Sequence, residues 1–553
     1  MRVAAIALLV ALAGVASSQD APPPPKAGHD LIDGQVKAKL ADLNLKAAPA
    51  ASDAEFLRRA FLDIVGSIPS LDHAEKFLAD KSSDKRAKLV DALLASDAYA
   101  ANWSYVWAGT FAGATGDGPF ADAVIYAVSK QLKPHFDKNE PISEVAKAVV
   151  TYTGKFEREN MRPGQMMEGY DDGGIALMYF RWQQSAGRDL PMFLANKFSR
   201  AFLGMQISCA QCHDHPFDKW TQEDFYGMAA FFTEVAVRPI RKEGVQQPIG
   251  YEVLENKMLG KVRGLQIPDS KKGRVKPQWL DTKEEPKSGE AMRAEFTRLL
   301  TSRANTQFAR AIVNKYWAHF FGRGIVNPPD DFNGRNKPSH PEMLEGLAAE
   351  FIAKNYDVKW LVREICASQA YQTSSRVKER TTDQEKYYAT ASVRALTPEQ
   401  IMASLITATL KDPSSVSLQK KGQYLKDFRF NFGDDEDAEL TEFEGTIPQA
   451  LMMMNSELIA RGTGGAPASG GTLRDRLRER REGKAGATRL DEILDTRKGA
   501  EERVRAIFLT TLTRQPTAKE LSRYVKYASS RGEDGFEDVM WTLLNTSEFL
   551  FNH

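Results

Sequence analysis

The sequence predicts a mainly α-helical protein with two helical domains joined by a small β-containing segment. Its 553 residues exceed the ~250–300 residues at which one hydrophobic core usually stops growing, which predicts two domains. Apolar residues recur at spacings of three and four on both sides of a segment rich in Val, Ile, Gly and Pro. Hydrophobic residues at 42% and charged residues at 27% are typical of a globular chain rather than a disordered or membrane-embedded one.

The N-terminus has the pattern of a signal peptide. A basic second residue precedes an apolar stretch over residues 3–13, followed by small residues, so we assign residues 1–18 to a signal peptide. Residues 19–29 contain four consecutive prolines and are predicted to form a stiff tether. The apolar stretch is shorter than the ~20 residues of a spanning helix. We therefore expect an exported chain, periplasmic or extracellular, with no membrane span after cleavage.

The first domain is predicted over residues 30–232 and is mainly helical. Apolar positions lie on one helical face at residues 55–64, 89–94 and 142–150. From residue 233 to 289 the pattern changes to short apolar clusters among charges, Gly and Pro, which predicts short strands and a linker.

The second domain is predicted over residues 290–553 and is again helical. Helical periodicity returns at residues 290–300, 307–321, 341–354 and 534–549. Two helix starts are marked by their residues: Thr397 precedes Pro398, and Thr517 with Glu520 forms a capping box.

Charge gives no indication of a nucleic-acid partner. The 74 basic and 73 acidic residues leave a formal charge of +1, so no overall field attracts an anionic polymer. An acidic run at 434–437 is predicted to be a solvated loop, and a Gly-rich, then basic, stretch near 462–484 a flexible segment. Acidic residues alternate with the basic ones in that stretch, which also argues against a nucleic-acid patch.

One cluster carries recognisable chemistry, the sequence Cys-Ala-Gln-Cys-His that begins at Cys209. Two thiols three residues apart can form thioethers with the vinyl groups of a haem, and the adjacent histidine can ligate its iron. Cys209, Cys212 and His213 are therefore predicted to bind haem c. Haem of this type is attached outside the cytoplasm, which agrees with the predicted export.

The next residues leave two alternatives open. Asp214, His215 and Asp218 add nitrogen and oxygen ligands close to His213, and such a set suits zinc or iron in a non-haem hydrolase or binding protein. Cys209 and Cys212 could instead form a disulfide in a cell-surface interaction scaffold. We assign no catalytic residue, and the sequence alone does not decide whether the protein is an enzyme.

Other candidate residues have simpler explanations. Cys366 falls on an apolar helix face and is predicted to be buried and inert, and His319 and His340 are predicted to be structural. A sixth haem ligand is not identified; the candidates are His319 and the methionines Met166, Met167, Met178, Met205, Met228, Met452, Met453 and Met454.

Several stretches resemble a known two-domain family. In the first half, the stretches at residues 56–70, 88–96 and 209–232 resemble the planctomycete cytochrome-type domain of unknown function 1549. In the second half, the stretches at residues 310–324, 338–342, 368–372 and 544–553 resemble its usual companion, the planctomycete domain of unknown function 1553. This resemblance implies exported redox or polysaccharide-related work with a redox or cell-surface partner, and it is an argument by analogy.

Overall fold

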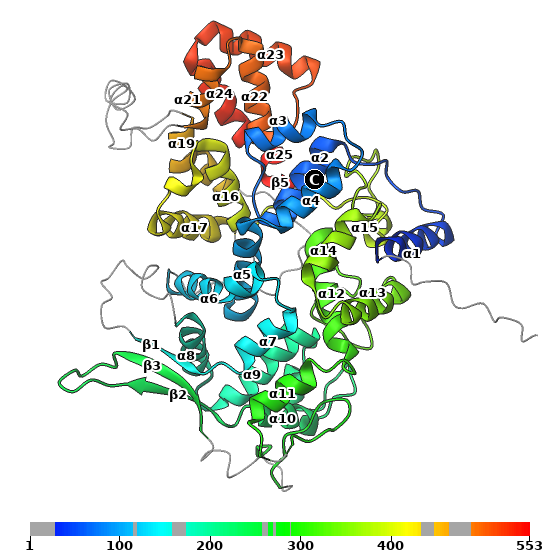
Figure 1. Cartoon of the computed structure of the whole chain (residues 1–553), viewed down its shortest axis with the longest axis vertical. Helices are drawn as coiled ribbons and strands as arrows, with labels where there is room; N and C mark the ends of the chain where they lie inside the picture. The colour runs from blue at the N-terminus through cyan, green and yellow to red at the C-terminus, as the bar shows by residue number, and fades with distance from the viewer. Residues whose placement is uncertain are drawn as a thin grey trace, which may run out of the picture.

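Helices supply most of the regular structure, as the sequence predicts. The computed structural model describes residues 28–113, 119–157, 173–256, 264–268, 273–287, 289–432, 447–463 and 488–553. The predicted signal peptide, the acidic run at 434–437 and most of the segment at 462–484 lie outside these residues. The fold class, mainly α with a small sheet, is confirmed (Figure 1).

The chain opens with seven helices: α1 (Gly28–Asp42), α2 (Asp53–Val65), α3 (Leu71–Ala79), α4 (Lys85–Leu94), α5 (Asp97–Ala112), α6 (Pro119–Asp137) and α7 (Ile142–Val150). Helices α2, α4 and α7 confirm the three helices predicted in this part. Helix α1 begins at Gly28, so the last two residues of the predicted tether belong to the first helix.

The middle of the chain contains the sheet and the segment that carries the cysteines. Its elements are β1 (Gly154–Glu157), α8 (Gly174–Ala186), η1 (Gly187–Asp189), α9 (Leu190–Phe198), η2 (Ser199–Leu203), η3 (Ser208–Gln211), α10 (Gln222–Ala230), β2 (Val235–Ile240) and β3 (Gly250–Glu255). The predicted strands of residues 233–289 are β2 and β3, which pair antiparallel with Val237 opposite Val253. Strand β1 was not predicted. It is too short to show an alternating pattern, and it pairs with the other edge of β3.

The second half is a succession of helices: α11 (Met292–Leu300), α12 (Thr306–Phe321), α13 (Pro341–Ala353), α14 (Val358–Ala367), α15 (Thr382–Lys386), α16 (Pro398–Thr409), η5 (Pro413–Ser415), α17 (Leu418–Phe432), α18 (Ile447–Met454), α19 (Glu457–Gly462), α21 (Arg489–Thr496), α22 (Ala500–Leu512), α23 (Ala518–Arg531), α24 (Glu533–Leu544) and α25 (Ser547–Leu550). Short strands β4 (Arg394–Ala395) and β5 (Phe551–Asn552) pair with each other.

Capping decides where several of these helices begin and end. Thr397 and Thr517 both form capping boxes, which confirms the two predicted helix starts. The helix predicted at residues 534–549 is two helices in the structure. The hydroxyl of Thr546 accepts the backbone N–H of Phe549 and starts α25 as a separate turn.

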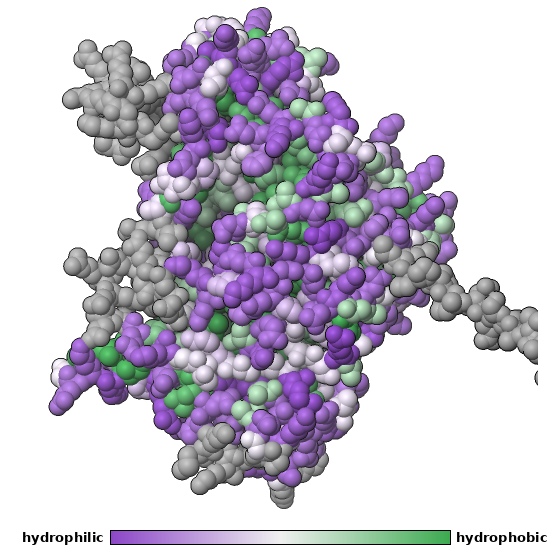
Figure 2. All heavy atoms as spheres, viewed as in Figure 1, coloured by the Kyte–Doolittle hydropathy of each residue, from purple (hydrophilic) through white to green (hydrophobic). Residues whose placement is uncertain are grey.

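Helices from the two halves of the chain pack against each other. Figure 1 shows the C-terminal helix α22 beside α3, and α1 beside α13 and α14, and these pairs are in contact. The buried apolar side chains form one continuous cluster that runs through both halves. The face of the molecule in Figure 2 is largely hydrophilic, with apolar side chains set back between the helices. The domain limits at residues 30–232, 233–289 and 290–553 stay a prediction.

Buried charged side chains on α2 connect the two halves of the chain. The carboxylate of Asp63, which is fully buried, accepts hydrogen bonds from Tyr371 Oη (2.8 Å), Arg394 Nη2 (2.8 Å) and Asn552 Nδ2 (2.7 Å). All three donors belong to the second half of the chain. Helix α2 is therefore held by residues more than three hundred positions away.

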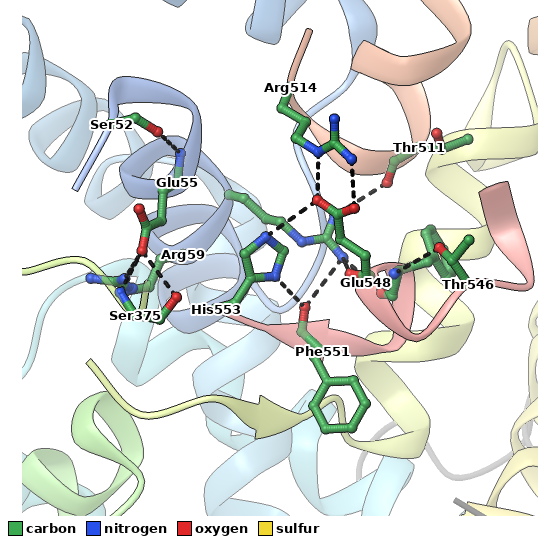
Figure 3. Close-up of polar contacts among 12 residues, drawn as sticks. Ser52, Glu55, Arg59, Ser375, Thr511, Arg514, Thr546, Glu548, Phe551 and His553 are labelled. Atoms are coloured by element: carbon green, nitrogen blue, oxygen red, sulfur yellow. Dashed lines mark hydrogen bonds and ion pairs between the residues drawn. The ribbon is translucent and has the colours of Figure 1, made fainter. Parts of the chain in front are cut away.

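Arg58, five residues before Asp63 on α2, forms a second connection between the two halves of the chain. Its guanidinium donates to the carbonyl oxygens of Thr511 (3.2 Å) and Phe549 (2.7 Å). Figure 3 shows this region, where Glu548 faces Arg514 and Phe551 lies on the same C-terminal segment. The last residues of the chain thus complete the surroundings of a helix near its beginning.

Asp63→Ala should lower the free energy of unfolding by about 3–5 kcal/mol, because it leaves three buried donors, one of them charged, without an acceptor. The matched control is Asp91→Ala, which removes an exposed ion pair with Arg363 (2.7 Å) and should cost less than about 1 kcal/mol. Urea unfolding of both variants measures the difference, and equal losses would contradict the role given to Asp63.

Stability should fall in acid through Glu520. Hydrogen bonds from Arg514, which also binds Glu548, lower the pKa of Glu520 to about 2. A lowered folded-state pKa contributes stability above the ordinary value, and that contribution is lost as the pH falls from about 4.5 towards 2. Glu520→Gln should therefore flatten the decline in the free energy of unfolding below about pH 4.5. Glu501→Gln, at an exposed ion pair with Arg505, should leave that decline unchanged.

Candidate functional site

The cysteine cluster lies on a short turn of its own. Helix α9 continues into the π-helical segment η2 and ends at Gly204, which adopts a left-handed conformation with φ 62°. A Cβ atom at Gly204 would lie 2.8 Å from the ring of Phe332, so the conformation and the close contact both require glycine. The cysteine motif begins beyond Gly204, in the 3₁₀ turn η3.

The turn presents both thiols together. Cys209 lies within the 3₁₀ helix η3, and Cys212 is the residue that caps its C-terminal end. Both are exposed free thiols, and Ala210 between them is fully buried and anchors the turn. Cys366 is also a free thiol, but it is 1% exposed and burial raises its pKa well above the ordinary value. This confirms the prediction that Cys366 is buried.

One ring nitrogen of His213 is used in a hydrogen bond, and the other is available to bind a ligand or a metal ion. Its Nδ1 lies 2.8 Å from the carbonyl oxygen of Asp214. A carbonyl oxygen only accepts, so Nδ1 carries the proton and donates it, and Nε2 keeps its lone pair. The side chain is exposed. A donated Nδ1–H is the usual arrangement of a histidine that ligates a metal through Nε2.

His215 uses both of its ring nitrogens within the loop. Its Nε2 lies 3.2 Å from the carbonyl oxygen of Gln206 and therefore donates, and its Nδ1 accepts the backbone N–H of Phe217 at 3.3 Å. Its own backbone N–H donates to the carbonyl oxygen of Trp220 (2.7 Å). His215 thus closes the loop that follows the motif.

The two carboxylates of the predicted metal set are also engaged locally. Asp214 Oδ1 accepts the backbone N–H of Gln222 at the start of α10 (3.0 Å), and Asp218 Oδ1 accepts that of Lys219 (2.8 Å). In the described part of the chain, no group of three or more His, Cys, Asp or Glu side chains is arranged to hold a metal ion. The structure therefore does not bring the four predicted ligands together, and a zinc or iron site there stays a prediction.

Helix α10 packs against the turn that carries the cysteines. It also contributes Tyr226, a residue that the sequence analysis missed. Thr221 and Asp224 form its capping box, and α10 packs against η3 and α9. Burial raises the pKa of Tyr226 on this helix, and so do the charges of Cys212 and Asp189. Helix α10 contacts η3, and no spacing pattern in the sequence links Tyr226 with the cysteine motif.

A loop from the second half of the chain lies against the segment that carries the motif. The backbone N–H of Phe332 donates to the carbonyl oxygen of Gly204 (2.7 Å). The guanidinium of Arg335 lies 3.6 Å from the centre of the Phe217 ring, a cation–π contact. The motif is thus placed at the boundary of the two halves, which the sequence had left open.

Most of the described histidine and methionine candidates are buried or half-buried, and Met454 is exposed, while Met166 and Met167 lie outside the described residues. His319 Nε2 lies 2.9 Å from the carbonyl oxygen of Asp63, and burial lowers the pKa of His319. His340 is 3% exposed, and burial lowers its pKa to about 4. Met178 and Met228 are core residues, and Met205 is half-buried in the turn before the motif.

The described residues contain no helix that is both long enough and apolar enough to cross a membrane.

Two family models match the chain. The first, a protein of unknown function (DUF1549), covers residues 31–237, and the second, a protein of unknown function (DUF1553), covers residues 292–429. No curated protein and no solved structure matches it. The motif lies within the first matched region and the loop that contacts it within the second.

In folded protein prepared without haem attachment, two of the three thiols should react rapidly. Cys209 and Cys212 are exposed, whereas Cys366 is buried, so an aromatic disulfide reagent should release two equivalents quickly and the third only after unfolding. Cys366→Ala should keep both fast equivalents, and the double variant Cys209→Ser, Cys212→Ser should lose both. Three fast equivalents would contradict the burial of Cys366. No fast equivalents from previously reduced protein would contradict the exposure of Cys209 and Cys212.

Proposed function

Since the chain belongs to the family in which domain of unknown function 1549 is followed by domain of unknown function 1553, we propose that its function centres on the exposed turn of the first domain. Cys209 and Cys212 attach a c-type haem, and His213 is its proximal ligand. The protein then acts in redox chemistry or electron transfer. The family descriptions name no activity, so the proposal rests on the residues of the turn.

The observation that carries the proposal is the hydrogen bond from His213 Nδ1 to the carbonyl oxygen of Asp214. It orients the imidazole and leaves Nε2 as the basic nitrogen, which iron requires. The two thiols lie in η3 and at its C-terminal cap, and both are exposed and therefore accessible to a maturation enzyme. The donor set therefore fits the group.

Each residue of the turn has a separate task in this proposal. Cys209 and Cys212 would hold the haem through two covalent links, His213 Nε2 would ligate its iron, and the Asp214 carbonyl oxygen holds the imidazole ring. A bound haem supplies one-electron chemistry, which the protein tunes through its axial ligand and the groups around it. Buried Ala210 and the capped helix α10 keep the turn in place.

Export to the periplasm or cell exterior is part of the same proposal. It is supported by the signal-peptide pattern of residues 1–18 and by the chemistry of the motif, because haem c is attached outside the cytoplasm.

Expression of the full chain in a bacterial periplasm with haem-attachment machinery tests the proposal. Intact mass should show one covalent haem, and the reduced protein should show a Soret band. Cys209→Ser with Cys212→Ser should lose the adduct, while His213→Ala should keep covalent haem but change the ligation seen in the spectrum.

The matched control is His215→Ala, because both ring nitrogens of His215 are already used. This variant should keep the wild-type spectrum. Absence of both the haem adduct and the Soret band from the wild-type sample would contradict the proposal. Stoichiometric zinc or iron in that sample, lost in His215→Ala, would favour a metal-dependent hydrolase or binding protein. A mass lower by two hydrogen atoms would favour a disulfide-containing scaffold.

A further inference from the structure

Helix α1 begins the first domain but is docked on the second. It contacts α13 and α14, and Figure 1 shows it beside them at the edge of the molecule. Its buried residues Ile32, Val36 and Leu40 follow one face of the helix. The packing on α13 is close, because a Cβ atom at Gly346 would lie 2.5 Å from Leu31 Cδ2. The apolar face of α1 therefore covers part of the second domain.

An exposed segment joins α1 to the rest of the chain. Residues 41–47 are exposed or half-buried, and Asn44 among them has a left-handed conformation with φ 53°. The chain is anchored again just beyond this segment. Ala48 and Ala51 donate their backbone N–H groups to carbonyl oxygens of the second domain, at 2.7 and 2.8 Å. Helix α1 can therefore move about residues 41–47 while these two anchors, and α2 after them, stay in place.

The start of α1 is held by one carboxylate of the second domain. His29 Nδ1 lies 2.6 Å from Glu364 Oε2 on α14, and the backbone N–H of His29 donates to the same oxygen at 2.9 Å. Gly28 lies directly on this carboxylate side chain, since a Cβ atom at Gly28 would be 2.9 Å from Glu364 Cγ. The side chain of His29 is 39% exposed, so its imidazole exchanges protons with the solvent.

Carboxylates outnumber cations around this imidazole. The hydrogen bond with Glu364 is the main reason why the pKa of His29 is raised, and burial opposes it. The charges of three carboxylates raise this pKa further. Neutral His29 therefore leaves the carboxylates without one positive charge that holds them together. The groups that face His29, directly or through Glu364, are Asp30 and Asp33 on α1, Glu364 on α14, and Glu350 and Lys354 on α13.

We propose that helix α1 is a pH-sensitive strap, which the imidazolium of His29 holds on Glu364 in mild acid and which detaches more readily when His29 loses its proton. A group whose pKa is raised in the docked state adds stability that is complete below its ordinary value of about 6.5. That stability is lost as the pH rises through the raised value. Neutral His29 still donates through Nδ1, so only the contribution of the charge is lost.

Hydrogen exchange of the full chain at pH 6 and pH 8 tests the proposal. After correction for the intrinsic exchange rate at each pH, the opening equilibrium of α1 should rise about tenfold at pH 8, the change that one unit of pKa shift produces. Helix α7 lies in the same domain and contains no histidine, so its opening should not follow this rise. Equal changes in α1 and α7, or no change in α1, would overturn the proposal.

Variants separate His29 from other effects of pH. His29→Gln should remove the rise, and His29→Lys should keep α1 docked at pH 8 because its positive charge remains. The matched control is His135→Gln, since His135 Nδ1 lies 2.5 Å from Glu140 Oε2 on another helix. This variant should keep the full rise.

A full rise in His29→Gln would also overturn the proposal. The wild-type profile needs no variant, so it decides even if a variant folds poorly. Protein without haem serves throughout, so failure of haem attachment and failure of the strap are separate results.

Discussion

Two charged side chains buried on helix α2 constrain the rest of the structure. Neither Arg58 nor Asp63 can be buried without partners, because an unpaired charge in a protein interior costs several kcal/mol. Their partners all come from the second half of the chain, including Asn552 and Phe549 near its end. Helix α2 therefore reaches its native environment only when the second domain is in place. The two family domains are parts of one folded body with a continuous core.

The same dependence extends to the cysteine turn. The turn follows Gly204, the residue at which η2 ends. Phe332, which contacts Gly204 closely, lies on a loop of the second domain. That loop also carries Asp330, the ion-pair partner of Arg200, and Arg335, which lies over Phe217. The loop thus connects the segment that carries the motif to the second domain. The proposed site lies where the two domains meet, as ligand sites in multidomain proteins frequently do.

Local patterns in the sequence predicted several of the helices but not every boundary between them. Periodicity was sufficient for α7, which buries one continuous face, and it also located α2 and α12, although these two helices bury most of their residues. The hydroxyls of Thr397 and Thr517 marked helix starts because capping is a local interaction. The break between α24 and α25 and the short strand β1 were missed. Each depends on one hydrogen-bonding choice within a few residues, which periodicity over a longer window does not resolve.

For the candidate site, the sequence by itself determined the chemistry: two thiols at the right spacing, an adjacent histidine, and a further set of possible ligands. Only the tertiary structure decided which of these groups are available. His213 and His215 are the same residue type two positions apart, yet one keeps a free ring nitrogen and the other does not. The physical reason is that availability depends on hydrogen bonds and burial, and their partners come from parts of the chain that folding alone brings together.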